Sequence, residues 1–161
     1  MKKFGILLTL LVLAGLGINS CGDNTNFPTD DPGAMTLGSM SATIDGSAFS
    51  SQQSMAVRIG SQISITGTRI FNNLQSGENI TLVVLNAQTG PNTAAGYFTY
   101  TPDNAKPSEA QTWFSSQASV ELTKITATEI QGRFSFVGQN TQNSGSTKNV
   151  SNGVFRARIT Y

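Results

Sequence analysis

The sequence contains no histidine and only one cysteine among its 161 residues. Without histidine the chain has no Ser-His-Asp or Cys-His catalytic group, no imidazole ligand for zinc, and no imidazole to change charge near neutral pH. A single cysteine forms neither an intramolecular disulfide nor a thiolate metal cluster. We therefore expect no cofactor and no metal site.

Charged residues are also scarce, at 12% of the chain, against about a quarter in an average globular protein. The formal net charge is +1, which provides no basic surface for nucleic acid. Ser, Thr, Asn and Gln make up more than a third of the residues. Hydroxyls and amides must therefore supply most of the polar surface.

The N-terminus has the pattern of an export signal. Lys2 and Lys3 precede an uncharged, mostly apolar run over residues 4–18. A membrane-spanning helix needs about 20 apolar residues, whereas a run of this length is typical of the hydrophobic region of a signal peptide. We expect residues 1–20 to be a signal peptide.

This run ends at Ile18-Asn19-Ser20-Cys21, which resembles the lipobox of bacterial lipoproteins. In that family the cysteine sulfur receives a diacylglycerol, and the chain is cleaved just before the cysteine. Asn19 departs from the pattern, which more often has Ala, Ser or Thr there. The resemblance implies that Cys21 carries the acyl chains, palmitate or similar, that hold the protein on a membrane. The alternative is an ordinary secretory signal followed by a coincidental cysteine.

Residues 21–38 show no apolar periodicity and contain the turn signal Pro32-Gly33, so we expect a flexible acylated tether there. Its acidic residues lack the spacing of a calcium loop, and they loosely resemble the surface-export signals of Bacteroidota lipoproteins. The remaining residues, 39–161, are enough for one ordinary domain.

That domain has the pattern of β-strands. Asp45-Gly46 and Gly60-Ser61 each separate two segments of alternating apolar residues, which predicts two hairpins. The short β-branched run over 80–85 predicts a buried central strand, and residues 155–161 alternate to the end of the chain. Roughly nine strands, with no helical stripe, predict an all-β, antiparallel sandwich or barrel-like domain.

Two stretches resemble small all-β lipoproteins of unknown function from Bacteroidota. Residues 40–49 are similar to their opening pattern A-x-I-(D/N)-G-x-x-F, and residues 125–136 and 150–155 are similar to their C-terminal half. These motifs are sheet and turn patterns. The resemblance implies an exported all-β lipoprotein and supplies no catalytic residue.

The carboxylates give no clear catalytic pair. Asp45 is explained by its turn and Glu78 by the start of a strand, while Asp103 and Glu109 share one exposed loop. A Ser-x-x-Lys dyad is absent. We expect the protein not to be an enzyme, and a carboxylate-based hydrolase is the remote alternative.

Aromatic residues suggest a binding site instead. Tyr97, Tyr100, Trp113 and Phe114 flank the loop over residues 101–110, near one end of adjacent strands. Aromatic rings beside amides and hydroxyls are a common way to bind sugars, so these four residues are a candidate ligand platform; the alternative is that they are core residues.

The expected function is a non-catalytic, possible glycan-binding module of the bacterial cell envelope, lipid-anchored in the outer membrane on its periplasmic or surface face. The alternative is a structural lipoprotein that docks another envelope protein.

Overall fold

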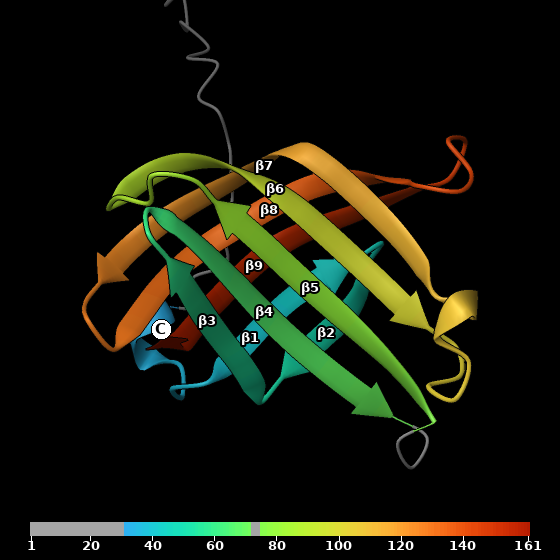
Figure 1. Ribbon diagram of the computed structural model, residues 1–161, viewed down its shortest axis with the longest axis horizontal. Coiled ribbons are helices and arrows are strands. Elements are labelled where there is room, and N and C mark those ends of the chain that lie inside the picture. The colour runs from blue at the N-terminus through green and yellow to red at the C-terminus, as the bar shows by residue number, and fades with distance from the viewer. Residues whose placement is uncertain (1–30, 72–74) are drawn as a thin grey trace, which may run out of the picture.

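The computed structural model describes residues 31–71 and 75–161 as nine β-strands and two short 3-10 helices (Figure 1). The strands are β1 (Ser39–Ile44), β2 (Ser47–Ser51), β3 (Gln53–Ile59), β4 (Gln62–Phe71), β5 (Ser76–Val84), β6 (Gly90–Thr101), β7 (Gln111–Ile125), β8 (Glu129–Asn140) and β9 (Thr147–Thr160), and the helices are η1 (Pro32–Ala34) and η2 (Pro107–Glu109). Within these residues no helix is long and apolar enough to cross a membrane. The predicted signal peptide and Cys21 lie outside the described residues.

The turns explain where the first strands begin and end. Asp45 and Gly46 have φ values of 47° and 85°, the positive values that a two-residue type I′ hairpin turn requires, and they join β1 to β2. Gly60, with φ 62°, lies in the turn between β3 and β4. Both hairpins predicted from the sequence are therefore confirmed.

Seven strands close into a barrel because β9 is paired along both of its edges. It pairs antiparallel with β8 on one edge, and its last residues, Arg158–Thr160, pair parallel with Met55–Val57 of β3 on the other. The earlier part of this second edge pairs with β1, so the β1–β2 hairpin extends the sheet beyond the barrel. The predicted class, an all-β domain of about nine strands, is confirmed, and the architecture is the barrel.

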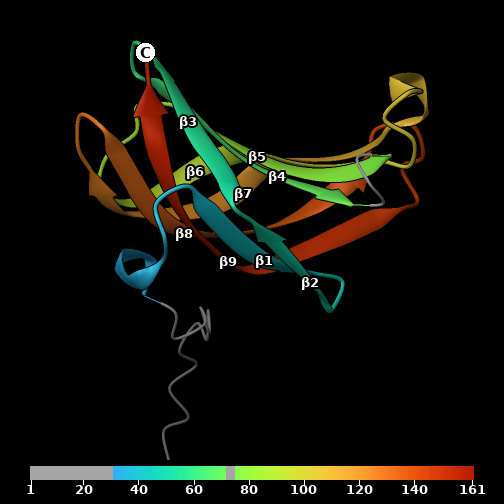
Figure 2. The same ribbon diagram turned by 90° about the horizontal axis from the view of Figure 1, so that it is seen from below.

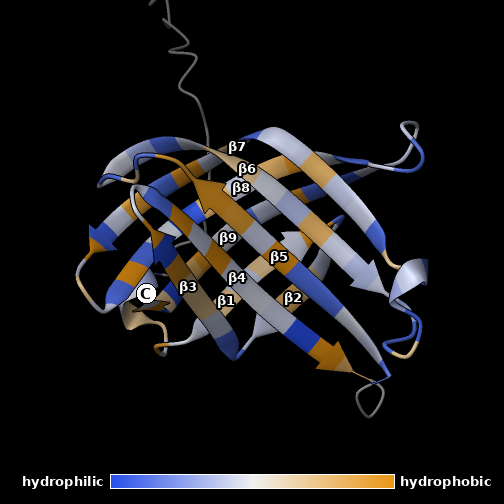
Figure 3. Cartoon of the chain, in the orientation of Figure 1, coloured by the Kyte–Doolittle hydropathy of each residue, from blue (hydrophilic) through white to orange (hydrophobic). Residues whose placement is uncertain are grey.

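Apolar side chains from alternate strand positions fill the barrel interior, and Figure 3 shows hydrophobic and hydrophilic residues alternating along the strands. The largest fully buried side chains include Phe49, Phe134 and Phe155, and the rings of Phe134 and Phe155 have centroids 6.1 Å apart. A Cβ at Gly153 would lie 2.6 Å from the Phe134 ring, so a glycine is needed there for the ring to pack.

The barrel has two distinct ends. At the η1 end lie the β3–β4, β5–β6 and β7–β8 connections and the C-terminus, where Tyr161 donates a hydrogen bond to the Ala127 carbonyl (2.9 Å). At the opposite end, which we call the mouth end, lie the β1–β2 turn, the β6–β7 loop with η2, and the β8–β9 loop. Figures 1 and 2 both show η1 and the C-terminus at one end and η2 at the other.

The last part of the predicted flexible tether is bound to the barrel. The Arg156 guanidinium donates hydrogen bonds to the carbonyls of Gly33 (3.1 Å) and Met35 (3.0 Å) and to the Glu129 carboxylate (2.7 Å). The Gly38 N–H also donates to the Arg156 carbonyl (2.8 Å). The chain therefore joins the barrel at the η1 end, and residues 32–38 are part of the folded unit.

Candidate functional site

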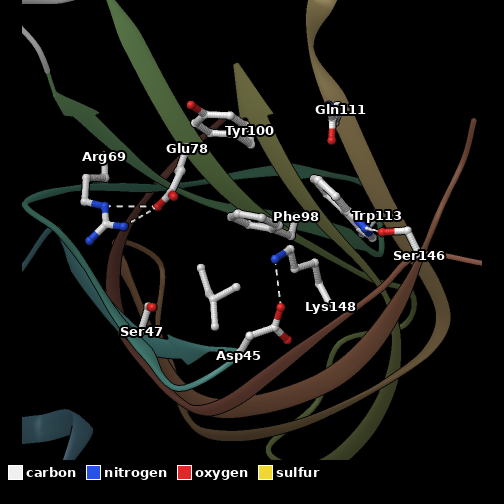
Figure 4. Close-up of a pocket in the computed structure, with 11 residues that line it drawn as sticks. Asp45, Ser47, Arg69, Glu78, Phe98, Tyr100, Gln111, Trp113, Ser146 and Lys148 are labelled. Atoms are coloured by element: carbon white, nitrogen blue, oxygen red, sulfur yellow. Dashed lines mark hydrogen bonds and ion pairs between the residues drawn. The ribbon is translucent and has the colours of Figure 1, made fainter. Parts of the chain in front are cut away.

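A cavity of about 400 Å³ opens at the mouth end of the barrel (Figure 4). It lies where the β1–β2 turn faces the ends of β4 to β7 and the start of β9. We call this cavity the mouth pocket. Its lining residues are Ile44, Asp45, Ser47, Arg69, Glu78, Phe98, Tyr100, Gln111, Trp113, Ser146 and Lys148.

One wall of the mouth pocket is aromatic. Phe98 of β6 and Trp113 of β7 are paired across the two strands, and their ring centroids lie 5.5 Å apart. Both are buried, whereas Tyr100, two residues further along β6, is partly exposed. The Trp113 indole N–H donates to the Ser146 hydroxyl (3.2 Å), which satisfies the one polar group of that ring.

A second wall carries the ion pair between Arg69 of β4 and Glu78 of β5. These residues are direct cross-strand partners, and Oε2 of Glu78 accepts hydrogen bonds from both Nε (3.1 Å) and Nη2 of Arg69. The remaining terminal nitrogen, Nη1, donates to the Ala48 carbonyl of β2 (2.6 Å). Arg69 thereby links the hairpin to the barrel. The other Glu78 oxygen, Oε1, forms no hydrogen bond within the part of the chain that the structure describes.

A third wall carries the ion pair between Asp45 and Lys148. Lys148 Nζ donates to one Asp45 carboxylate oxygen (2.8 Å), and the Asn149 N–H donates to the other (2.8 Å). These two hydrogen bonds, with that from Lys148 the larger cause, lower the pKa of Asp45 below its usual value. The Lys148 ammonium also lies 5.6 Å from the centre of the Trp113 ring, within reach of a cation–π interaction.

The Asp45 environment predicts a pH effect on stability. Because the folded-state pKa is lowered, this carboxylate contributes stability above its unfolded-state pKa, and the contribution is lost as the pH falls through the folded-state pKa. Asp45→Asn keeps a residue that tolerates the positive φ, and it should lower the free energy of unfolding at pH 7 by less than about 1 kcal/mol, since the pair is partly exposed. Urea unfolding measured from pH 7 down to pH 2 should show that the difference in the free energy of unfolding between the variant and the native protein disappears below about pH 4. A difference that stays constant with pH would contradict this assignment.

The structure does not bring the four predicted platform residues to one surface. Strand alternation turns Tyr100 and Trp113 into the mouth pocket, while Tyr97 and Phe114 lie on the outer wall with ring centroids 5.0 Å apart. Trp113 is only 4% exposed. The predicted set therefore divides into two residues of the pocket and two of the outer wall.

Sequence reasoning missed the charged half of the site. Asp45 and Glu78 were explained by a turn and a strand start, and no spacing in the sequence linked them to Lys148 or Arg69. Arg69 and Glu78 meet through cross-strand register, and Lys148 reaches Asp45 because the β8–β9 loop returns β9 beside β1. The described residues contain no group of three or more Asp, Glu, Cys or His that could hold a metal.

The fold and the mouth pocket define the class of protein: it is an all-β, barrel-like domain with a cavity at its mouth end. A family model described as Domain of unknown function (DUF6252) matches residues 37–157, about three quarters of the chain. The chain belongs to this family. No curated protein and no solved structure matches it.

Proposed function

We propose that the protein is a non-catalytic binding module that holds a sugar-like ligand in the mouth pocket. The observation that supports this most is the composition of the pocket walls, where aromatic rings face hydroxyl, amide and paired charged groups. Aromatic rings pack against the apolar faces of sugar rings, and the polar groups fix the orientation of the hydroxyls. A volume of about 400 Å³ lies in the range of small-ligand pockets.

The charges of the pocket favour an uncharged ligand. Arg69 is paired with Glu78, and Lys148 with Asp45, so the lining carries no net charge. Hydrogen-bonding capacity nevertheless remains at Glu78 Oε1, at Lys148 and at the side chain of Gln111. A polyhydroxylated ligand can use these donors and acceptors without breaking either ion pair.

The same ion pairs argue against the hydrolase alternative. A glycosidase needs one carboxyl group that holds a proton at neutral pH and gives it to the leaving group. Asp45 has a lowered pKa, and Glu78 accepts two hydrogen bonds from a guanidinium. The lowered pKa of Asp45 does not favour a protonated carboxyl, and Glu78 is held by Arg69 in an ion pair, so we propose binding without catalysis.

We further propose that Cys21 anchors this module in the bacterial cell envelope through its acyl chains. The supporting observations are the lipobox-like sequence Ile18-Asn19-Ser20-Cys21 and its position directly after the uncharged run. When the gene is expressed in a bacterium fed with labelled palmitate, the native protein should incorporate the label and Cys21→Ala should not. Equal labelling of the two proteins would refute the anchor.

The ligand is tested with a glycan array. The full chain, purified in detergent, should bind a restricted set of neutral saccharides, and Tyr100→Ala should lose that signal. Tyr97→Ala is the matched control, because it removes the same side chain from the same strand but on the outer wall. No binding to any saccharide, or equal loss in both variants, would contradict a sugar site in the mouth pocket.

A further inference from the structure

Exposed apolar residues gather at the η1 end of the barrel, opposite the mouth pocket. Val57, Ile59, Leu85 and Tyr161 are 37%, 72%, 63% and 79% exposed, and we call these four residues the apolar rim. Figure 3 shows hydrophobic colour along β3 and at the end of β5. Large apolar side chains in one exposed group are unusual on a surface that contacts only water.

Strand register shows that the rim is contiguous. Val57 pairs with Thr160, so the backbone of Tyr161 lies beside β3, one residue beyond the paired segment, while its hydroxyl reaches the Ala127 carbonyl at the β7–β8 connection. On the other side of β3, Ile59 pairs with Gln62 of β4, and Leu85 directly follows Val84, the partner of Ile63. The rim therefore runs from the C-terminus across the β3–β4 turn to the end of β5.

The charges of the described residues differ between the two ends of the barrel. In the half of the barrel that carries the rim, basic residues outnumber acidic ones: Arg58, Lys124, Arg133, Arg156 and Arg158 against Asp31, Glu121 and Glu129. Around the mouth the balance is reversed: Asp45, Glu78, Asp103 and Glu109 against Arg69, Lys106 and Lys148. The apolar rim therefore lies in the more positive half of the molecule.

The chain leaves the barrel at the same end. Arg156 binds Gly33 and Met35 there, and only nine residues, 22–30, separate Cys21 from Asp31. Such a segment spans at most about 35 Å even when fully extended. An acyl anchor on Cys21 would therefore keep the η1 end close to the bilayer.

We propose that the apolar rim is a membrane-contact surface that inserts into the headgroup region of a bilayer containing anionic lipids. Apolar side chains flanked by Arg and Lys are the combination that binds such an interface. The contact orients the barrel so that the mouth pocket points away from the membrane, toward soluble or polymeric ligands. This inference rests on the proposed lipid anchor at Cys21.

Tryptophan substitutions with brominated lipids test the rim. Full-length protein, purified from bacterial membranes, is reconstituted in vesicles of phosphatidylethanolamine with phosphatidylglycerol as the minor component, with or without bromine on the acyl chains. Ile59→Trp and Leu85→Trp should each add a blue-shifted emission that bromine quenches. Val137→Trp is the matched control, because Val137 is an apolar residue of β8 that is 59% exposed away from the rim. The native Trp113 signal should not be quenched, because Trp113 lies at the mouth end.

Absence of quenching in both rim variants, or equal quenching in the Val137→Trp control, would overturn the proposal and leave the rim as a contact for a protein or a second copy of the chain. Palmitate labelling of the same preparations reports the anchor separately. A labelled protein without quenching refutes only the membrane contact of the rim and leaves the anchor standing. An unlabelled protein with quenching at positions 59 and 85 supports the rim and refutes the anchor.

Discussion

Gly132→Ala is expected to destabilise the barrel by about 2 kcal/mol or more, the largest loss of stability that a single added methyl group should cause here. A Cβ at Gly132 would lie 2.5 Å from the carbonyl oxygen of Glu121 on β7 and 2.9 Å from the ring of Phe155. The backbone oxygen belongs to the neighbouring strand, and Phe155 is fully buried, so neither can move away easily. The entropic advantage of Ala over Gly, about 0.5–1 kcal/mol, is too small to offset this clash.

Gly145→Ala is the matched control for this prediction. Gly145 lies in the β8–β9 loop, and its nearest neighbour to an added Cβ is the Asn143 side-chain oxygen at 3.5 Å, an ordinary contact. Urea unfolding followed by circular dichroism should give a lower midpoint for Gly132→Ala and an unchanged midpoint for Gly145→Ala. Equal midpoints for the two variants would mean that β7, β8 and β9 are not packed as described.

Tyr100→Ala is expected to weaken ligand binding by about tenfold or more, which corresponds to about 1.4 kcal/mol. Tyr100 is the partly exposed ring of the aromatic wall and therefore the ring most available to a ligand, whereas Phe98 and Trp113 are almost fully buried. Its removal takes away both ring contact and a hydroxyl group. Tyr97→Ala should bind as the native protein does. Isothermal titration with the saccharide that gives the strongest array signal measures both affinities.

The sequence was sufficient to predict the fold class, an all-β domain of about nine strands. The two hairpins could be predicted from Asp45-Gly46 and Gly60-Ser61, because their turns need residues that tolerate a positive φ, as glycine does. The alternation of residues 155–161 correctly placed Phe155, Ala157 and Ile159 in the core. Barrel closure could not be predicted, because it depends on the short parallel pairing of β3 with β9. Local patterns carry no information about two segments about a hundred residues apart.

Alternation also failed to show which face of a strand is buried. Met55 and Ile59 alternate as core residues would, yet Met55 is 54% and Ile59 72% exposed, and the small Ala56 points inward instead. For the same reason alternation puts Tyr97 and Tyr100 on opposite faces of β6, but it could not show which of them lines the pocket and which lies on the outer wall. The face is set by packing against distant strands, which a periodicity of two leaves open.

We propose that the ligand binds in the mouth pocket, and the single tryptophan of the chain tests this most directly. Trp113 lines that pocket, and its indole N–H donates to Ser146, so the protein has one indole N–H signal in a ¹⁵N NMR spectrum and that signal reports the site. On titration with the array-selected saccharide, the signal should shift and saturate in the native protein and in Tyr97→Ala, and should respond only at much higher concentration in Tyr100→Ala. Binding that leaves the Trp113 signal unmoved would place the ligand elsewhere and contradict the claim.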